Sequence, residues 1–288
     1  TTSENKHRNR RNLRRYSNKM IGMNYIGKMK ERLANQMFQY AALKGIAKNR
    51  GFQYCVPPSN YKDGNDQWDE HQLFHTFELG NLNPLQIQYI DPDRCKLVRP
   101  QHFHFDEDLF NGCPDNVSLL GFFQSEKYFK NVREELLADF TFKYNLREDC
   151  NGFIKDYDRP IALHIRRTDY AQYSHHPIQS LTYYAEALEQ FEDDRPVFIF
   201  SDDPAWCQQQ KLFDDERFMI SENGHLTDLC MMTLCSDFII ANSSFSWWGA
   251  WLSPNEDKKV IAPKKWFGPP LDAEHDTKDL YCEGWTVL

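Results

Sequence analysis

Two adjacent arginines follow a short apolar segment near the middle of the chain. Residues 161–165 alternate isoleucine and leucine with smaller or polar side chains, which is typical of a buried strand. Arg166, Arg167 and Asp169 come directly after it. Because a planar guanidinium suits bidentate contact with phosphate or carboxylate, this pattern indicates a site for a phosphorylated ligand. The alternative is an Arg–Asp ion pair that only fixes the loop, and these residues alone favour neither.

Polar side chains also follow two later apolar segments. Residues 197–200 are followed by Asp202, which would accept hydrogen bonds from a ribose or a base, or simply help to start a helix. After residues 237–241 the chain continues with Asn242, Ser243, Ser244, Phe245 and Ser246. Hydroxyls and free backbone N–H groups at a helix start can bind phosphate, although serines there also serve as N-caps. Together with the arginines, they could neutralise a leaving diphosphate without a metal ion.

The second half of the chain has the regular alternation that would position these clusters. The pattern predicts strands at 161–166, 196–201, 217–221, 237–241 and 258–262, and helices at 180–192, 204–213, 225–235 and 245–253. This order is typical of βαβ units and predicts an α/β fold with a parallel sheet. Since ligands bind outside the carboxyl ends of such strands, the polar clusters should lie together. The motifs of P-loop enzymes, dinucleotide dehydrogenases and G-x-S-x-G hydrolases are missing from the sequence.

The first half is less regular. We expect a strand within 20–26, a helix over 33–51 with a C-terminal glycine cap, a buried strand at 117–121 and a helix over 125–140. Asn35 and Gln36 would lie in the first turn of the helix over 33–51, where amides and free N–H groups meet an anion or a sugar, or only cap the helix. A polar stretch at 145–159 predicts a domain boundary.

Composition limits the class of protein. The 288 residues are 41% hydrophobic, which excludes a largely disordered chain, and their net charge is −8. Residues 1–19 have a net charge of +6 and the remaining residues one of −14, so the surface of the main body is a poor match to nucleic acid. We expect 1–19 to be a basic disordered arm, either a solvated leader or, through 6–19, a weak peripheral contact with anionic membrane lipids.

Cysteine spacing and hydropathy narrow the setting further. The eight cysteines form no C-x-x-C pair, which argues against a structural zinc site, and we predict no metal. No window approaches the ~20 apolar residues of a membrane span, and no signal-peptide pattern is present. We therefore expect a cytoplasmic protein, with peripheral membrane contact as an option, and the Golgi lumen as the alternative if an anchor has been trimmed.

Four motifs in order carry a family resemblance. They are Asn35-Gln-Met-Phe-Gln-Tyr-Ala41, His164-Ile-Arg-Arg-Thr-Asp-Tyr170, Ser201-Asp-Asp203 and Ala241-Asn-Ser-Ser-Phe-Ser-Trp-Trp-Gly-Ala-Trp-Leu252. Together they resemble the α-1,2-fucosyltransferases of glycosyltransferase family 11. The resemblance implies a GT-B-like α/β fold, with two Rossmann-like domains whose parallel sheets face across a cleft. It also implies GDP-β-L-fucose as donor, inversion to an α-1,2 linkage on a galactose-containing glycan acceptor, and no cofactor.

The resemblance also assigns roles to particular positions. His164 would lie near guanine or ribose, Arg166 would hold the pyrophosphate, Arg167 would support the loop, Asp202 would contact the nucleoside, Asn242, Ser243, Ser244 and Phe245 would line the phosphate site, and Asn35 and Gln36 would approach the sugar. Residues 20–155 would form the acceptor-side domain and 156–288 the domain that binds the GDP-sugar. One departure is the segment 30–34, Lys-Glu-Arg-Leu-Ala, where the family usually has a glycine-rich turn.

The reaction needs a group that takes the proton of the acceptor hydroxyl, or a loose transition state that needs little such help. Asp169 is the candidate base, with Arg166 as the other catalytic residue; a salt bridge in which Asp169 only orients Arg166 is the alternative. Two other readings stay open: a related GDP-fucose transferase with an α-1,6 linkage or protein O-fucosylation, and an inactive nucleotide- or glycan-binding module. A pair of histidines, His175 and His176, is expected to lie in a surface loop.

Overall fold

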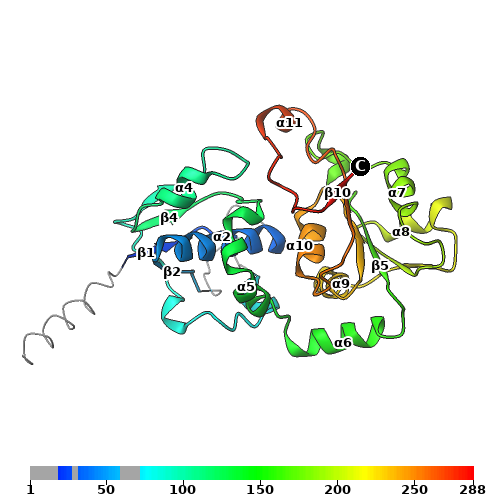
Figure 1. The fold of residues 1–288 in the computed structure, drawn as a ribbon, viewed down its shortest axis with the longest axis horizontal. Coiled ribbons are helices and arrows are strands. Elements are labelled where there is room, and N and C mark those ends of the chain that lie inside the picture. The colour runs from blue at the N-terminus through cyan, green and yellow to red at the C-terminus, as the bar shows by residue number, and fades with distance from the viewer. Residues whose placement is uncertain (1–18, 28–31, 59–71) are drawn as a thin grey trace, which may run out of the picture.

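The computed structural model describes residues 19–27, 32–58 and 72–288. Two α/β lobes lie side by side, each built on a parallel sheet (Figure 1). The predicted basic arm, apart from its last residue, and residues 30–31 of the altered turn at 30–34 lie outside the described residues, so neither prediction is tested. Over the described part of the chain, every helix is too short or too polar to span a membrane.

The first lobe, as far as the structure describes it, contains a four-stranded sheet in the order β2-β1-β4-β3. Its strands are β1 (Met20–Gly22), β2 (Gln53–Cys55), β3 (Lys96–Val98) and β4 (Val117–Leu119). Helix α2 (Leu33–Arg50) ends at Gly51, whose φ of 66° turns its N–H back to the carbonyls of the last turn. The predicted helix over 33–51 and its glycine cap are therefore confirmed.

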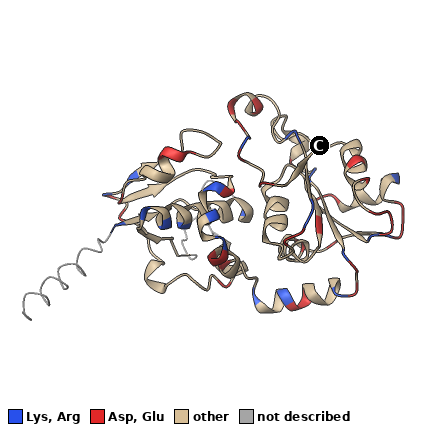
Figure 2. Cartoon of the chain, viewed as in Figure 1, with Lys and Arg blue, Asp and Glu red and all other residues tan. Residues whose placement is uncertain are grey.

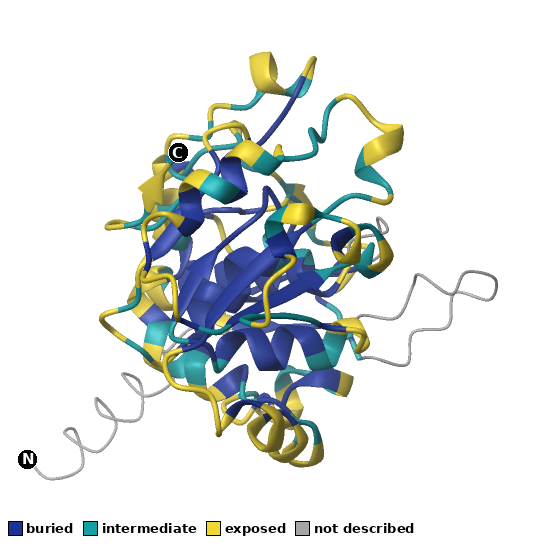
Figure 3. Ribbon diagram, turned by 90° about the vertical axis from the view of Figure 1, so that its right-hand side faces the viewer, coloured by how far each residue is buried: buried dark blue, intermediate teal, exposed yellow. Residues whose placement is uncertain are grey.

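The second lobe contains a sheet of six described strands in the order β10-β9-β8-β5-β6-β7, all parallel. The strands are β5 (Ile161–Ile165), β6 (Val197–Ser201), β7 (Phe218–Ile220), β8 (Asp237–Ile239), β9 (Val260–Ala262) and β10 (Thr286–Val287). Every residue of β5 is buried, because helices cover both faces of the sheet (Figure 3). The five strands predicted here are confirmed in order, and β10 was not predicted.

Three of the four helices predicted between these strands are shorter than the sequence pattern indicates, whereas the fourth, Ser244–Leu252, has the predicted length. The bounds of the described helices after α2 are α3 (Leu73–Thr76), α4 (Glu107–Gly112), α5 (Arg133–Asp139), α6 (Tyr144–Ile154), α7 (Leu181–Leu188), α8 (Pro204–Gln208), α9 (His225–Thr233), α10 (Ser244–Leu252) and α11 (Leu271–Glu274). The 3-10 turns are η1 (Pro84–Gln86), η2 (Glu126–Tyr128), η3 (Lys130–Val132), η4 (Tyr170–Gln172) and η5 (Lys211–Phe213).

For two of the predicted helices, the structure shows why their extent is wrong. The segment 125–140 forms η2, η3 and α5 in succession, because Phe129 leaves helical geometry with φ −142° and ψ 7°. The ring of Phe129 stacks on Trp248 at 5.5 Å, so tertiary packing overrides the helical pattern. The helix predicted over 204–213 stops at Gln208, where the side chain of Gln210 donates to the carbonyl of Trp206 at 2.8 Å.

An aromatic core joins the two lobes. The ring of Phe38 on α2 lies 4.5 Å from that of Trp247 and 4.9 Å from that of Trp248, both on α10. Helix α10 carries no charged residue (Figure 2), which suits its position between the lobes. Since burial of one large apolar side chain contributes about 1.5–3 kcal/mol, this packing fixes how the lobes sit against each other.

Helix α6 occupies the polar stretch where the sequence predicts a domain boundary. It runs along one side of the molecule between the lobes (Figure 1) and packs on α9. The thiol of Cys150 on α6 donates to the carbonyl of Thr227 on α9 at 3.6 Å. The division into 20–155 and 156–288 stays a prediction, because one continuous hydrophobic core includes residues of both lobes.

Candidate functional site

The carboxyl ends of three strands meet at one edge of the second sheet. Ile165 at the end of β5 pairs with Ser201 at the end of β6, and Leu163 pairs with Ile239 at the end of β8. Because these strands are parallel, the residues that follow them lie on the same side, which we call the carboxyl edge. The polar clusters predicted from the sequence come together there.

Arg166 lies at the centre of the carboxyl edge. Its Nη2 donates to Asp169 at 2.8 Å, and its Nη1 lies 3.3 Å from an oxygen of Asp202. The guanidinium also lies 5.5 Å from the ring centroid of Tyr170, and the side chain is only 18% exposed. A guanidinium has five N–H donors, so two carboxylates hold its orientation and still leave donors for an anion.

Asp202 holds the backbone of the loop after β5. Its Oδ1 accepts from the N–H of Arg167 at 2.9 Å, and its Oδ2 accepts from the N–H and hydroxyl of Thr168 at 3.1 and 2.5 Å. With the ion pair to Arg166, both oxygens already have partners. The expected contact of Asp202 with a nucleoside stays a prediction, and the observed contacts position Arg166.

Arg167 points toward α8. Its Nε donates to Asp203 at 3.2 Å, and its guanidinium carbon lies 3.9 Å from the ring centroid of Trp206, a close cation–π contact. These contacts agree with the expected role of Arg167 in supporting the loop. Its inclusion among the donor-binding residues stays a prediction.

His164 is a buried residue of β5 that contacts α10. Its Nδ1 lies 2.8 Å from the hydroxyl of Ser246, and its ring centroid is 5.3 Å from that of Phe245. Burial, reinforced by the charge of Arg166, lowers the pKa of His164 to about 3. The imidazole is therefore neutral at physiological pH. Its expected contact with guanine or ribose stays a prediction.

The start of α10 supplies the hydroxyls that the sequence predicts for a phosphate site. Ser243 is the N-cap, and its hydroxyl accepts from the N–H of Phe245 at 3.3 Å. Ser244 follows as the first helical residue, half-buried. Ser243 thus has the N-cap role that was the alternative for these serines. The positive end of this nine-residue helix still lies at the carboxyl edge.

Asn242 is 2% exposed and joins two loops to this edge. Its Nδ2 donates to the carbonyls of Pro177 at 2.9 Å and Trp266 at 3.0 Å. Its Oδ1 is buried and has no hydrogen-bond partner among the described residues. An unpaired buried acceptor costs about 1–3 kcal/mol, so this oxygen suits a hydroxyl or N–H donor of a ligand better than a phosphate.

Asp169, the candidate base, pairs with cations from both lobes. Besides Arg166, it lies 3.9 Å from Nη2 of Arg32, the residue before α2. Partial burial acts against ionisation, but the hydrogen bond from Arg166 and the charge of Arg32 outweigh it and lower the pKa of Asp169. A carboxylate with a lowered pKa is a weaker base, which fits the alternative that Asp169 orients Arg166. Its catalytic role stays a prediction.

Asn35 and Gln36 have partners within the first lobe. The Oδ1 of Asn35 accepts from Nε2 of Gln124 at 2.9 Å. Gln36 is 1% exposed, and its Oε1 accepts from the N–H of Gln72 at 2.6 Å, which joins α2 to the start of α3. Neither of these contacts involves the carboxyl edge. The expected approach of both residues to the sugar stays a prediction.

Comparison with known families decides the class of protein. The sequence pattern of Glycosyl transferase family 11 matches residues 97–288, more than half of the chain. The chain belongs to this family.

Several relatives of this chain have names that state an activity. The chain is 31% identical over 201 residues to the O-antigen biosynthesis glycosyltransferase WbnK of Escherichia coli, a match that covers 63% of this chain and 65% of that protein. An α-1,2-colitosyltransferase of Escherichia coli is 30% identical, with 82% of this chain and 89% of the relative covered. Galactoside α-(1,2)-fucosyltransferase 2 of Bos taurus is 25% identical, with 88% and 80% covered.

Solved structures share the fold at low sequence identity. The crystal structure of POFUT1 in complex with GDP matches with a TM-score of 0.54 and 11% identity, covering 85% of this chain and 98% of that one. This likeness concerns the fold alone. Together with the two parallel sheets, it confirms the predicted GT-B-like α/β architecture.

Some residues of the carboxyl edge were missed by the sequence reasoning. Tyr170 contacts Arg166 with its ring and donates its hydroxyl to the carbonyl of Asn242 at 2.9 Å, and burial raises its pKa to about 12. Its position directly after Asp169 was the available signal. His175 and His176 lie in a loop, as predicted, and the structure adds that the ring of His176 is half-buried and stacks on Tyr170 at 4.8 Å.

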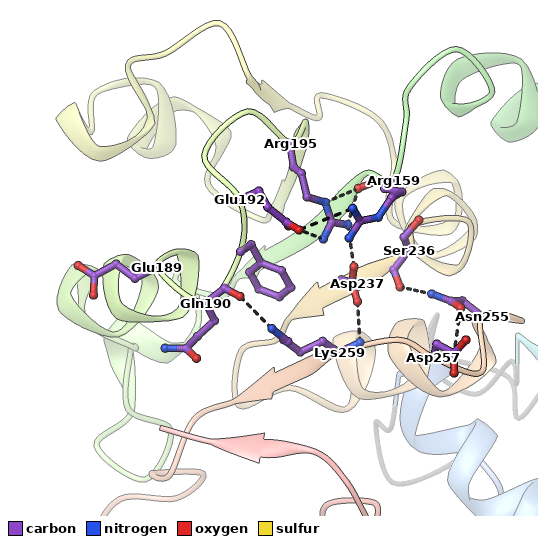
Figure 4. Close-up of a pocket in the computed structure, with 11 residues that line it drawn as sticks. Arg159, Glu189, Gln190, Glu192, Arg195, Ser236, Asp237, Asn255, Asp257 and Lys259 are labelled. Atoms are coloured by element: carbon purple, nitrogen blue, oxygen red, sulfur yellow. Dashed lines mark hydrogen bonds and ion pairs between the residues drawn. The ribbon is translucent and has the colours of Figure 1, made fainter.

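A hollow lies at the opposite, amino edge of the same sheet (Figure 4). Its volume is about 730 Å³, and its lining includes Arg159, Arg195, Asp237 and Lys259. It lies before the starts of β5, β8 and β9, not beyond their ends.

In the described part of the chain, no three His, Cys, Asp or Glu residues gather into a group that would hold a metal ion.

Proposed function

We propose that the chain transfers L-fucose from GDP-β-L-fucose to the 2-hydroxyl of a galactose-type acceptor, with inversion to an α-1,2 linkage and without a metal ion. One observation carries this proposal: Arg166 is largely buried at the carboxyl edge, fixed by two carboxylates, and linked through Tyr170 to Asn242, two residues before α10. Membership of family 11 and two relatives named for α-1,2 transfer support the class of reaction.

The proposed chemistry places each residue in relation to the diphosphate. Arg166 would bind the diphosphate, while N–H groups and hydroxyls of Ser243 and Ser244 face its oxygens. As the bond from fucose C1 to the β-phosphate oxygen breaks, its electron pair stays with GDP, and Arg166 offsets the growing negative charge. The acceptor oxygen bonds to C1 from the opposite face, which inverts that carbon, and it gives up its proton.

The sugar that is transferred has a second candidate. The α-1,2-colitosyltransferase relative is more similar to this chain than the bovine fucosyltransferase, at 30% against 25% identity. Colitose is therefore the competing sugar within the same reaction type. We favour fucose because the motifs around Arg166 and Asn242 resemble those of the α-1,2-fucosyltransferases.

Calorimetric titration and product analysis test this proposal together. The chain is titrated with GDP, GDP-fucose, GDP-colitose and GDP-mannose, and then incubated with lactose and either GDP-fucose or GDP-colitose, each measurement being made with and without a chelator. We expect binding of GDP and GDP-fucose that the chelator does not change, and a fucosylated lactose whose NMR spectrum shows an α-1,2 linkage. An α-1,6 product, loss of transfer in chelator, or faster transfer from GDP-colitose would each contradict a stated part of the proposal.

The location of the protein is a separate proposal. We propose a cytoplasmic enzyme whose basic segment 6–19 makes weak contact with anionic membranes, at about 1 kcal/mol per charge near the surface. Sedimentation with phosphatidylserine vesicles at low and high salt tests it. Equal binding to neutral vesicles, or binding that salt does not weaken, would refute the electrostatic contact.

A further inference from the structure

His176 lies next to the proposed donor site. Its imidazole stacks on the ring of Tyr170, with centroids 4.8 Å apart and planes 16° apart. Tyr170 in turn contacts the guanidinium of Arg166. On another side, the ring centroid of Phe267 lies 6.0 Å away. One aromatic ring therefore separates His176 from the group that would hold the diphosphate.

The loop that carries His176 is fixed to the carboxyl edge at several points. Asn242, buried at the end of β8, donates to the carbonyl of Pro177 at 2.9 Å. The N–H of Gly268 donates to the carbonyl of His175 at 3.1 Å, and any side chain at Gly268 would overlap the carbonyl oxygen of Ser174. The imidazole is thus held in place before any substrate binds.

The imidazole of His176 is also available as a base. Its ring nitrogens form no hydrogen bond with another described residue. The titratable and charged groups around it are Arg166, Asp169, Tyr170, His175 and, beyond Phe267, His275. Burial, followed by the neighbouring His175, lowers the pKa of His176 below the 6.5 that is ordinary for histidine. The ring is therefore neutral at pH 7 and can accept a proton.

We propose that His176 is the catalytic base that takes the proton from the acceptor hydroxyl, an inference that rests on the proposed function. The acceptor oxygen forms its bond to fucose C1, the bond from C1 to GDP breaks, and the hydroxyl proton moves to a ring nitrogen of His176. GDP leaves with the bonding electron pair. The proton then passes from the imidazolium to solvent, so charge and atoms balance.

Asp169 is less suited to this step. Its carboxylate accepts from Arg166 at 2.8 Å and faces Arg32, so proton uptake would cost it two ionic partners. His176 has no such ion pair with any residue that the structure describes. Asp169 is then a positioning residue for Arg166. A reaction with His176 as the base and one with Asp169 as the base would differ in how the rate depends on pH. A rate that depends on His176 falls as pH drops through the pKa of a histidine, whereas one that depends on Asp169 falls only at lower pH.

The test compares His176→Gln and His176→Phe with wild type, using His75→Gln on the exposed end of α3 as a matched control. We expect both His176 variants to lose roughly 10²–10⁴-fold in kcat while GDP binding by calorimetry changes less than about threefold. The acid limb of the wild-type profile of kcat/KM should vanish in His176→Gln. Added imidazole should restore part of the rate in a third variant, His176→Ala.

Several outcomes would overturn the inference. A kcat of His176→Gln near wild type, or an acid limb that stays in place, shows that the proton goes elsewhere or needs no base. Full activity of His176→Phe shows that only stacking matters. If His176→Gln loses GDP binding, the inference is tested by the kcat of His176→Phe, whose ring can still stack on Tyr170. A low kcat in that variant supports the inference, and full activity overturns it. Absence of transfer by wild type would instead refute the proposed function itself.

Discussion

The two edges of the second sheet use charged residues in opposite ways. At the amino edge, Arg195 is 6% exposed, and its guanidinium donates to the carbonyl of Arg159 and to Asp237 at 2.6 Å. The other oxygen of Asp237 accepts from the N–H of Lys259 at 2.6 Å (Figure 4). At the carboxyl edge, by contrast, Arg166 retains free donors and Asn242 has an unpaired buried oxygen.

This difference separates a structural edge from a functional one. The amino edge has a hollow of about 730 Å³, but its charges pair with each other and with backbone groups at the strand starts, so they stabilise the sheet. The carboxyl edge holds groups that cost stability in the absence of a ligand, as binding sites commonly do. A hollow by itself therefore identifies the site less well than the direction of the strands and the state of its polar groups.

The largest effect should come from removing Arg166. We expect Arg166→Ala to reduce kcat/KM by on the order of 10³-fold or more, because the developing charge on GDP loses its main partner. Circular dichroism should show an intact fold, since the residue lies at a strand end. Arg166→Lys, which keeps the charge but loses the planar fork, should recover only part of the rate. Near-normal turnover of Arg166→Ala would show that the carboxyl edge is not the functional edge of the sheet.

The corresponding change at the amino edge should act on stability instead. Arg195→Ala leaves the carboxylate of Asp237 buried without its ionic partner, so we expect the free energy of unfolding to fall by about 3–5 kcal/mol. Urea denaturation measures this loss. The fraction of Arg195→Ala that stays folded should retain the wild-type kcat. A stable variant with impaired transfer would instead indicate that the amino edge takes part in the reaction.

Substitution of Asp228, at the carboxyl edge, should have a smaller effect on the free energy of unfolding, and this effect should be a gain. Its Oδ1 accepts from the hydroxyl of Ser221, which follows β7, at 2.5 Å, and burial raises the pKa of Asp228 from 3.8 to about 6. Between these pH values the folded chain keeps a proton that the unfolded chain has lost. Stability therefore falls as pH rises from 3.8 to 6 and stays reduced above that.

Asp228→Asn removes this cost. At pH 8 the variant should be more stable than wild type by about 1–3 kcal/mol, and the gain should shrink toward zero at low pH. Urea denaturation at pH 5 and pH 8 follows the decrease, because pH 5 lies between the two pKa values and the gain there should be about half of that at pH 8. Asp214→Asn, at an exposed position, serves as the control and should change the free energy of unfolding by less than about 0.5 kcal/mol. A gain that does not depend on pH would rule out ionisation as the cause.

The sequence was sufficient for features set by local pattern. Alternating apolar segments predicted the parallel strands of the second lobe, and the rule that ligands bind beyond strand ends brought Arg166, Asp202 and Asn242 to one edge. The glycine after α2 was readable because a residue with positive φ is needed there. These predictions depend on residues close together in the chain and on a general topological rule.

Features set by distant contacts could not be predicted in this way. The break at Phe129 follows from packing against Trp248, more than a hundred residues away. The position of His176 depends on Gly268 and Asn242, which belong to two other loops. The sequence pattern therefore located the strand ends and placed His176 in a loop, but its contact with Tyr170 could not be predicted, because nothing near it in the sequence indicates what packs against it.

The smallest predicted effect tests whether the amino edge is structural throughout or only at its buried pair. Lys259 is exposed, and its ammonium donates to the carbonyl of Gln190 at 2.9 Å, so Lys259→Ala should cost no more than about 0.5–1 kcal/mol and leave kcat unchanged. The backbone N–H of Lys259, which bonds to Asp237, remains in this variant. A loss as large as that of Arg195→Ala would mean that the exposed rim, not the buried pair, holds the strand starts together. Unfolding by urea, measured side by side on both variants, distinguishes these cases.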